Sequence, residues 1–135
     1  MSFTGKVALV TGAGQGIGRA TAMLLAQRGA SVVCNSQSVT CEQTAKDVTA
    51  AGGKAIAIRS DVADTRAVEK MFADAYKEYE HIHVLINNAG GTDPVPNFPR
   101  IEDIKVEDWD RVVAVNLKGA FNCVRCVVPD MRKMK

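Results

Sequence analysis

The strongest constraint on the fold is an apolar strand that runs directly into a glycine-rich turn and then into a helix. Residues 6–11 form a continuous apolar run, which is typical of a strand buried on both faces. Four glycines follow within residues 12–18, and residues 17–28 show a helical pattern that Gly29 ends. At such a junction the backbone can approach a pyrophosphate that a Cβ would block, and the free N–H groups of the helix start can hold the anion. The sequence therefore predicts a phosphate-binding turn here.

The rest of the chain alternates short β-branched runs with longer helical patterns. Three further strands are predicted, at residues 31–35, 54–58 and 83–86. Three further helices are predicted, at residues 38–51 with Ser38 as N-cap, at residues 65–79 after the N-cap Asp64, and from about residue 106 to the end. The loop before the last helix carries Pro94, Pro96 and Pro99, which exclude a helix or a central strand. This alternation predicts an α/β fold with a parallel sheet covered on both faces, and we assign residues 1–135 to one domain.

Composition and charge narrow the function classes. The net charge of +2, without a block of Lys and Arg, argues against nucleic acid or a membrane surface as partner. We find no charged and apolar leader and no apolar run approaching about 18 residues, so we expect neither a signal peptide nor a membrane-spanning helix, and we expect a cytoplasmic protein. Cys123 and Cys126 form a C-x-x-C, but the segment is helical in pattern and nothing completes a zinc set. We therefore expect free thiols and no metal.

Four motifs occur in a fixed order along the chain. The turn has the pattern T-G-x-x-x-G-x-G, because Ile17 and not a glycine stands five positions after Gly12. Residues 61–62 are Asp-Val after the third predicted strand, and residues 87–90 are Asn-Asn-Ala-Gly after the fourth. Asn116 lies within the last helical pattern. With these motifs the chain resembles the short-chain dehydrogenase/reductase family along its whole length, and in particular its members similar to 3-oxoacyl-ACP reductase.

The resemblance implies a three-layer Rossmann-type fold whose parallel sheet has the order 3-2-1-4 in this chain. It implies that a nicotinamide dinucleotide is bound by Gly12, Gln15, Gly16, Ile17, Gly18, Ser36, Gln37, Asp61, Val62, Asn87, Ala89 and Gly90. In the family an Asp and the next backbone amide hold the adenine, and a helix Asn, here Asn116, holds a proton-relay water. Taken alone, Asp61 could cap a turn, Asn87 could satisfy loop backbone, and Asn116 could be a solvated helix position.

The choice between the two nicotinamide cofactors depends on the residues that follow the second strand. An acid at Ser36 would favour NAD, because it would accept from both ribose hydroxyls and repel a 2′-phosphate. A basic residue at Gln37 or Gln15 would favour NADP, and both positions are Gln. Hydroxyls and amides can hydrogen-bond a phosphate, so the sequence favours NADP by a small margin and leaves NAD open.

The resemblance implies hydride transfer between the nicotinamide and a carbonyl or hydroxyl carbon. In the family a Ser and a Tyr-x-x-x-Lys pair act on the substrate. The tyrosines of this chain are Tyr76 and Tyr79, and Glu80 and His83 stand four residues after them. We therefore expect a cofactor-binding half that is inactive alone, with Asn116 as its one catalytic position. A non-catalytic nucleotide-binding module and a structural partner of another chain remain alternatives.

Two further expectations concern the surface and the histidines. The last helix carries Trp109, Val113, Leu117, Ala120, Val124 and Val127 near one face, and Phe121 and Val128 widen it. With the fourth strand left as an unpaired edge, this face predicts a homo-oligomer that associates through the last helix. His81 and His83 begin the fourth strand, and we expect a structural role for both.

Overall fold

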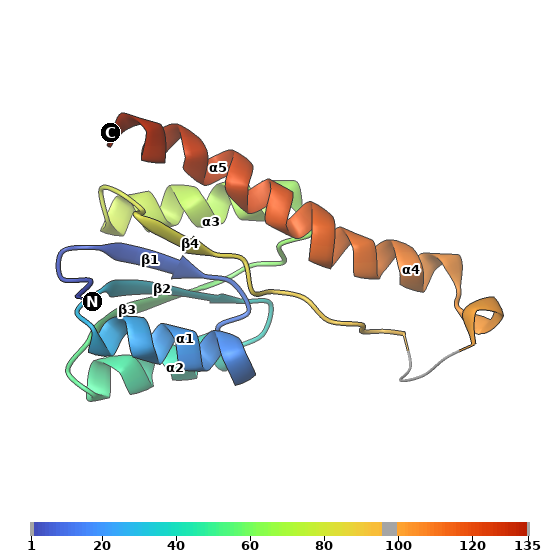
Figure 1. Cartoon of the computed structure of the whole chain (residues 1–135), viewed down its shortest axis with the longest axis horizontal. Coiled ribbons are helices and arrows are strands. Elements are labelled where there is room, and N and C mark those ends of the chain that lie inside the picture. The colour runs from blue at the N-terminus through green and yellow to red at the C-terminus, as the bar shows by residue number, and fades with distance from the viewer. Residues whose placement is uncertain (1, 96–99, 135) are drawn as a thin grey trace.

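A parallel sheet between two layers of helices makes up the chain (Figure 1). The computed structural model describes residues 2–95 and 100–134. The strands are β1 (Val7–Val10), β2 (Ser31–Ser36), β3 (Lys54–Arg59) and β4 (Val84–Ile86). The helices on either side of the sheet are α1 (Gly16–Gln27) and α2 (Thr40–Ala50) on one face, and α3 (Thr65–Glu78) and α5 (Gly119–Lys133) on the other. The predicted α/β class is confirmed.

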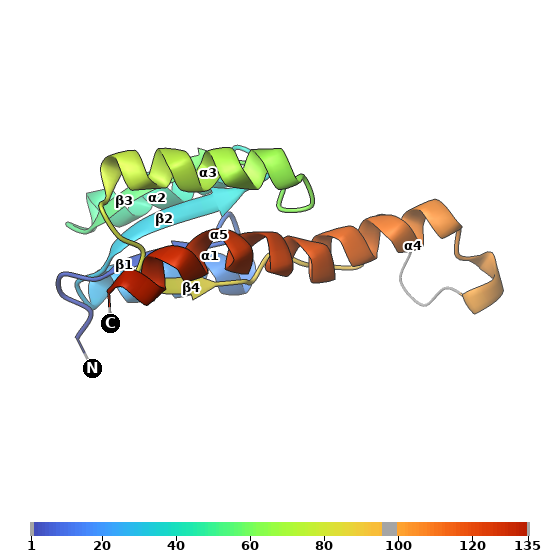
Figure 2. The same ribbon diagram turned by 90° about the horizontal axis from the view of Figure 1, so that it is seen from above.

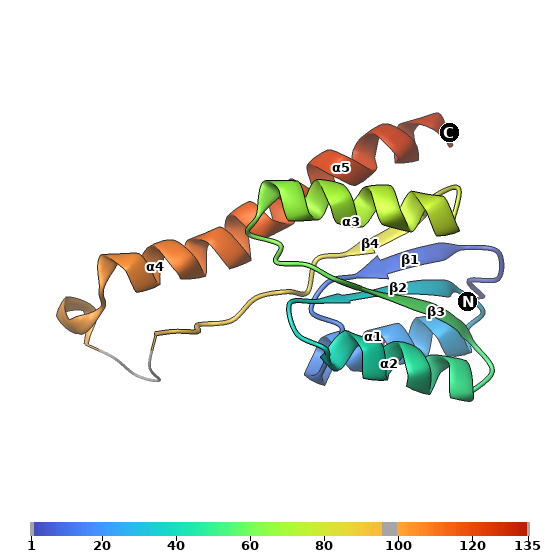
Figure 3. The same cartoon turned by 180° about the vertical axis from the view of Figure 1, so that it is seen from behind.

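The strand order is β3-β2-β1-β4 with all pairs parallel, as predicted. Alternate residues of β1 enter opposite cores. Ala8 and Val10 pack on the side of α1 and α2, whereas Leu9 packs with Val68 and Phe72 of α3. These three of the four residues of β1 are fully buried, which explains why the run is continuously apolar and not alternating. β4 has β1 as its one neighbour and forms an edge of the sheet (Figure 3).

The predicted helix starts were right in one case and wrong in another. Asp64 is the N-cap of α3, and its Oδ1 accepts from the N–H groups of Arg66 (2.9 Å) and Ala67 (3.1 Å). Ser38 does not cap α2: the N-cap position is Val39, which has helical φ and ψ and no side-chain cap. The Ser38 hydroxyl instead bonds the Thr40 hydroxyl at 2.7 Å, and the helix begins at Thr40, one residue later than an N-cap at Ser38 predicts.

The last helix is a composite. A short 3-10 turn (Ile101–Asp103) leads into α4 (Val106–Val113), a π turn (Ala114–Lys118) and then α5 without a break. α5 packs against α3 and β4, while α4 projects beyond the sheet (Figures 1 and 2). Four of the large apolar residues predicted for the wide face of this helix, Trp109, Leu117, Phe121 and Val124, are 43–69% exposed, whereas Val127 is buried.

The composition of this helix also corrects the expectation about membranes. Over the 28 residues Val106–Lys133 the helix is long and apolar enough to cross a membrane, with a mean hydropathy of 1.3 in its most apolar window. By length and composition alone, this segment meets criteria for a spanning helix that the sequence analysis did not expect to be met. Packing offers another explanation, because α5 buries Asn122, Cys123 and Val127 within the fold.

The cysteines and histidines do not line the cleft at the glycine turn. All four thiols are free, and burial raises the pKa of Cys34 and of Cys123 to about 12. His83 Nδ1 accepts from Val7 N–H at 3.1 Å, and His81 Nδ1 lies 2.9 Å from Asp130 Oδ1. Both histidines precede β4 and do not belong to it. Pro94 lies in the predicted irregular loop, and the expectation for Pro96 and Pro99 lies outside the described residues.

Candidate functional site

A cleft of about 630 Å³ opens at the carboxyl ends of the strands. The loops that follow all four strands contribute to it, and the last helix adds two side chains. The lining residues are Gly12, Gln15, Asn35, Ser36, Gln37, Ser60, Asp61, Val62, Ala89, Gly90, Gly91, Asp93, Pro94, Arg111 and Val115. The strand order reverses at β1, since the chain moves from β1 to β3 in one direction and then returns to place β4 on the other side. In open α/β sheets such a switch point is the usual place for a ligand crevice.

Glycine is required at the four positions of the turn for two different structural reasons. A Cβ on Gly12 would lie 2.8 Å from Asn88 Nδ2, on Gly14 1.9 Å from Thr40 Oγ1, and on Gly18 2.2 Å from Gly12 O. These three are glycines because neighbouring atoms leave no room. Gly16 differs: no heavy atom lies within 4 Å of its added Cβ, and its φ is +53°. Its backbone therefore faces open space in a left-handed conformation.

Helix α1 begins at this turn with its first N–H groups free of a side-chain cap. The N-cap Gln15 is extended and makes no capping hydrogen bond, and the first turn contains no acidic residue. The positive end of the helix dipole is thus not compensated locally. The free N–H groups at such a helix end can donate hydrogen bonds to a phosphate oxygen.

A hydroxyl and an amide tie the turn to the segment after β4. Thr11 is 1% exposed, and its Oγ1 accepts from the N–H groups of Asn88 and Ala89, each at 3.0 Å, while donating to Ile86 O at 3.3 Å. Asn88 Nδ2 donates to Thr11 O at 3.0 Å and to Gly12 O at 3.2 Å. These hydrogen bonds therefore fix the distance between the segments that follow β1 and β4 at the cleft.

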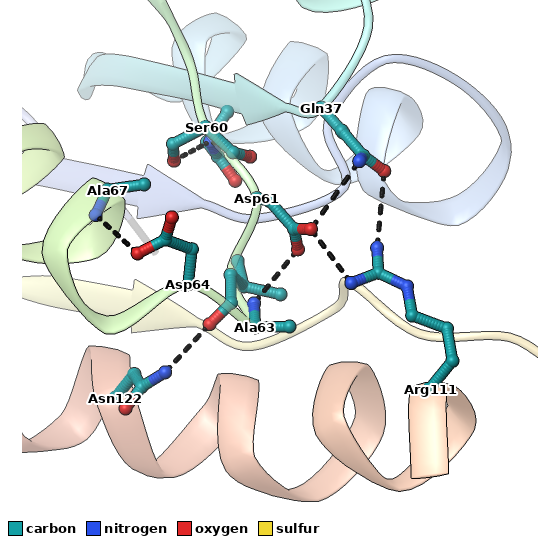
Figure 4. Close-up of polar contacts among 10 residues, drawn as sticks. Gln37, Ser60, Asp61, Ala63, Asp64, Ala67, Arg111 and Asn122 are labelled. Atoms are coloured by element: carbon teal, nitrogen blue, oxygen red, sulfur yellow. Dashed lines mark hydrogen bonds and ion pairs between the residues drawn. The ribbon is translucent and has the colours of Figure 1, made fainter. Parts of the chain in front are cut away.

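Asp61 and Arg111 meet at the other end of the cleft (Figure 4). Asp61 Oδ1 accepts from Ala63 N–H at 2.9 Å, and Arg111 Nη1 donates to Asp61 Oδ2 at 2.8 Å. Gln37 joins the pair, because its Nε2 lies 3.4 Å from Asp61 Oδ2 and Arg111 Nη2 lies 3.5 Å from its Oε1. Asn122 of α5 holds the segment after β3, because its side-chain amide donates to Val62 O at 2.9 Å. The ends of β2 and β3 are thus bridged to α4.

Asn116 fixes the loop that follows β4. Its Nδ2 donates to Gly91 O at 2.7 Å and to Val112 O at 2.8 Å, and its Oδ1 accepts from Gly91 N–H at 3.1 Å. The residue lies in the π turn, and π turns frequently occur at functional sites. Asn116 does not line the cleft itself.

Eight of the twelve residues that the sequence predicts for a cofactor line the cleft: Gly12, Gln15, Ser36, Gln37, Asp61, Val62, Ala89 and Gly90. Gly16, Ile17, Gly18 and Asn87 lie in the same segments but outside the lining, with Ile17 80% exposed. Sequence reasoning missed Arg111, Asn35 and Ser60. Asn35 is 1% exposed and donates to Ser60 Oγ at 2.8 Å, while its Oδ1 has no partner within the part of the chain that the structure describes.

Neither tyrosine lines the cleft. Tyr76 and Tyr79 lie at the far end of α3 and beyond it, and burial raises the pKa of Tyr76 to about 12. Across residues 2–95 and 100–134, no group of three or more His, Cys, Asp or Glu side chains could hold a metal ion.

Comparison with known proteins identifies the family. The sequence profile of the short chain dehydrogenases matches residues 6–135. The chain belongs to this family. It is 44% identical over 123 residues to elsinochrome reductase 1 of Elsinoe fawcettii, covering 90% of this chain and 45% of the relative. It is 38% identical over 135 residues to an NADPH-dependent aldehyde reductase-like protein of Arabidopsis thaliana, covering 91% of this chain and 49% of the relative.

A solved short-chain dehydrogenase fold agrees with this assignment. The structure of a 3-ketoacyl-ACP reductase from Sinorhizobium meliloti 1021 matches with a TM-score of 0.88 and 37% identity, covering 95% of this chain and 49% of that one. The resemblance to the ketoacyl-ACP reductase type and the Rossmann-type fold are thereby confirmed. The chain spans about half the length of the relatives that it matches.

Proposed function

We propose that the cleft binds a nicotinamide dinucleotide and that this chain forms the dinucleotide-binding domain of a short-chain dehydrogenase. The observation that carries the proposal is the position of the cleft, at the carboxyl ends of all four strands and at the switch point of the sheet. The pyrophosphate would lie against the turn of residues 12–18. The adenine would lie against Asp61 and Val62, and the nicotinamide ribose against residues 87–90.

The residues present fit such a ligand in two respects. Gly16 turns its backbone toward open space that a side chain would fill, which suits the approach of a phosphate. Asn35 offers the cleft a buried carbonyl oxygen that the described residues leave without a partner. The nicotinamide, when bound, supplies the hydride. The residues of this chain bind and orient the dinucleotide.

For the whole protein we propose hydride transfer between the nicotinamide and a carbonyl or hydroxyl carbon of a small substrate. Asn116 would keep its place beside the cleft as the proton-relay position. Within residues 1–135, no tyrosine lies where it could act as a general acid toward the cleft, so we propose that these residues alone reduce no carbonyl compound. We also propose a cytoplasmic location, because thiols stay reduced in that compartment and the four cysteines are free.

NADP is the cofactor we favour. Ser36 and Gln37 present a hydroxyl and an amide at the end of β2, and one relative of the chain is an NADPH-dependent aldehyde reductase-like protein. We also propose a homo-oligomer that buries the exposed apolar residues of the last helix. Large apolar side chains contribute about 1.5–3 kcal/mol each when they leave water, so four such residues favour self-association.

Fluorescence titration of the folded chain with NADPH and with NADH tests the binding proposal. We expect saturable binding of both, with NADPH bound more tightly. If a chain with the circular dichroism of a folded α/β protein bound neither at millimolar concentration, the proposal would be wrong. An assay with generic ketones and both reduced cofactors tests the expected lack of turnover, with the intact mass as a check on the sample.

A further inference from the structure

We propose that Arg111 supplies the positive charge that selects a 2′-phosphate, so that cofactor choice in this protein is decided from the last helix and not from the second strand. This inference rests on the proposed dinucleotide site and deepens it. Arg111 is the one basic residue among the described residues that line the cleft. It comes from α4, far in sequence from the glycine turn and from β2.

The position of the guanidinium supports a role toward the 2′-position of the ribose. In dinucleotide folds the residues after the second strand face the ribose hydroxyls, and here these residues are Ser36 and Gln37. Arg111 Nη2 lies 3.5 Å from Gln37 Oε1, a long and weak contact. Nη1 is held at 2.8 Å by Asp61, so the guanidinium is anchored on one side and weakly bonded on the other. A phosphate oxygen is a stronger acceptor than the Gln37 amide and would replace it at Nη2.

The charges of the cleft make this arginine necessary for a dianion. Its lining contains two carboxylates, Asp61 and Asp93, and one cation, Arg111. The side chain of Arg111 is 36% exposed and that of Asp61 is 26% exposed, so neither charge is fully screened by water. Without Arg111, a 2′-phosphate would meet two negative charges and no positive one. With it, the guanidinium offsets Asp61 and offers charge-assisted donors beside Gln37.

Two adenosine fragments separate this role from all other contacts. Adenosine 2′,5′-bisphosphate and adenosine 5′-monophosphate differ by the 2′-phosphate alone, and neither needs the nicotinamide end of the site. Calorimetric titration of both gives an affinity ratio for each variant. We expect the folded chain to prefer the bisphosphate and Arg111→Gln to lose on the order of tenfold in bisphosphate affinity, with a much smaller change for the monophosphate. Arg111→Lys should retain part of the preference.

Arg125→Gln is the matched control. Arg125 lies on the same composite helix, is also paired with a carboxylate (Glu69), and is absent from the cleft lining, so the same loss of net charge should leave the ratio unchanged. Asp61→Asn gives a reciprocal test. It removes the charge that offsets Arg111, so the ratio should shift further toward the bisphosphate even if both fragments bind more weakly.

Several results would overturn the inference. They are an equal loss of both fragments in Arg111→Gln, an unchanged ratio, or a parent chain that binds the monophosphate at least as tightly as the bisphosphate. Failure of the proposed function looks different: a folded parent chain would then bind neither fragment, and circular dichroism of each variant distinguishes this from unfolding.

Discussion

Replacing Thr11 by Val should destabilise the chain far more than an isosteric change at one residue suggests. The buried Thr11 Oγ1 accepts from two backbone N–H groups that follow β4. Asn88 N–H has a second acceptor, Ile86 O at 3.1 Å, whereas the hydroxyl is the partner that the described residues give to Ala89 N–H. Leaving the part-buried Ala89 N–H unpaired costs about 1–3 kcal/mol, and the weakened second bond adds about 0.5–1.5 kcal/mol. We expect the free energy of unfolding to fall by about 2–4 kcal/mol.

Urea unfolding followed by circular dichroism measures this change, with an unchanged m value as the sign that stability alone differs. Thr11→Ser keeps the hydroxyl and removes one methyl group, so it should cost about 1 kcal/mol. Thr21→Val serves as the surface control, because the Thr21 hydroxyl returns to Ile17 O within α1, and its loss should stay below about 0.5 kcal/mol. If Thr11→Val were as stable as Thr11→Ser, the hydroxyl would not hold the two segments together as argued.

Three further outcomes are expected. Gly16→Val should abolish binding of the adenosine fragments with little loss of helix content, because φ is +53° and the side chain would fill the open space beside the turn. Normal binding by a variant with the circular dichroism of the parent chain would place the phosphate elsewhere. Partial burial alone would raise the pKa of Asp130, but the hydrogen bonds from His81 and a backbone N–H lower it on balance. The carboxylate therefore stabilises the fold above the unfolded pKa of about 3.9, and the stability difference from Asp130→Asn, about 1 kcal/mol at neutral pH, should shrink as the pH falls below about 4 in urea titrations. Phe121→Glu should shift the mass measured by light scattering toward that of the monomer. Ile101→Glu should not, although Ile101 is 77% exposed, because this residue lies outside the long helix. A monomeric parent chain would contradict the proposed apolar contact.

The sheet and the cleft could be predicted because local signals agree with each other there. The apolar run of β1, the glycine turn and the capping Asp64 each act within a few residues, and the order of the motifs gives the topology. Asn35 and Arg111 escaped prediction for a different reason, since their roles depend on neighbours at the ends of other strands. Ser38 shows the limit of capping rules: its hydroxyl is hydrogen-bonded to the hydroxyl of Thr40, which is the first residue of the helix.

A π turn interrupts the helical period of the last helix. An α-helix rotates by about 100° per residue, and a π turn carries one residue more than the α turn it replaces. Residues before Ala114 and after Lys118 therefore cannot be counted on one helical wheel. Burial along this helix follows its packing: α4 projects beyond the sheet and leaves Trp109 exposed, whereas α5 packs on α3 and β4 and buries Val127.

The same π turn gives the chain a place where its length can vary during evolution. Removing one residue between Ala114 and Lys118 would close the wide turn into an ordinary helical one, while α4 and α5 kept their positions on either side. Arg111 would still reach Gln37 and Asp61, and α5 would still pack on α3. The deletion would instead shift Asn116 and change its hydrogen bonds to the Gly91 backbone. Insertions and deletions at this point would thus alter the side of the cleft at Gly91 without disturbing the side at Asp61 and Gln37.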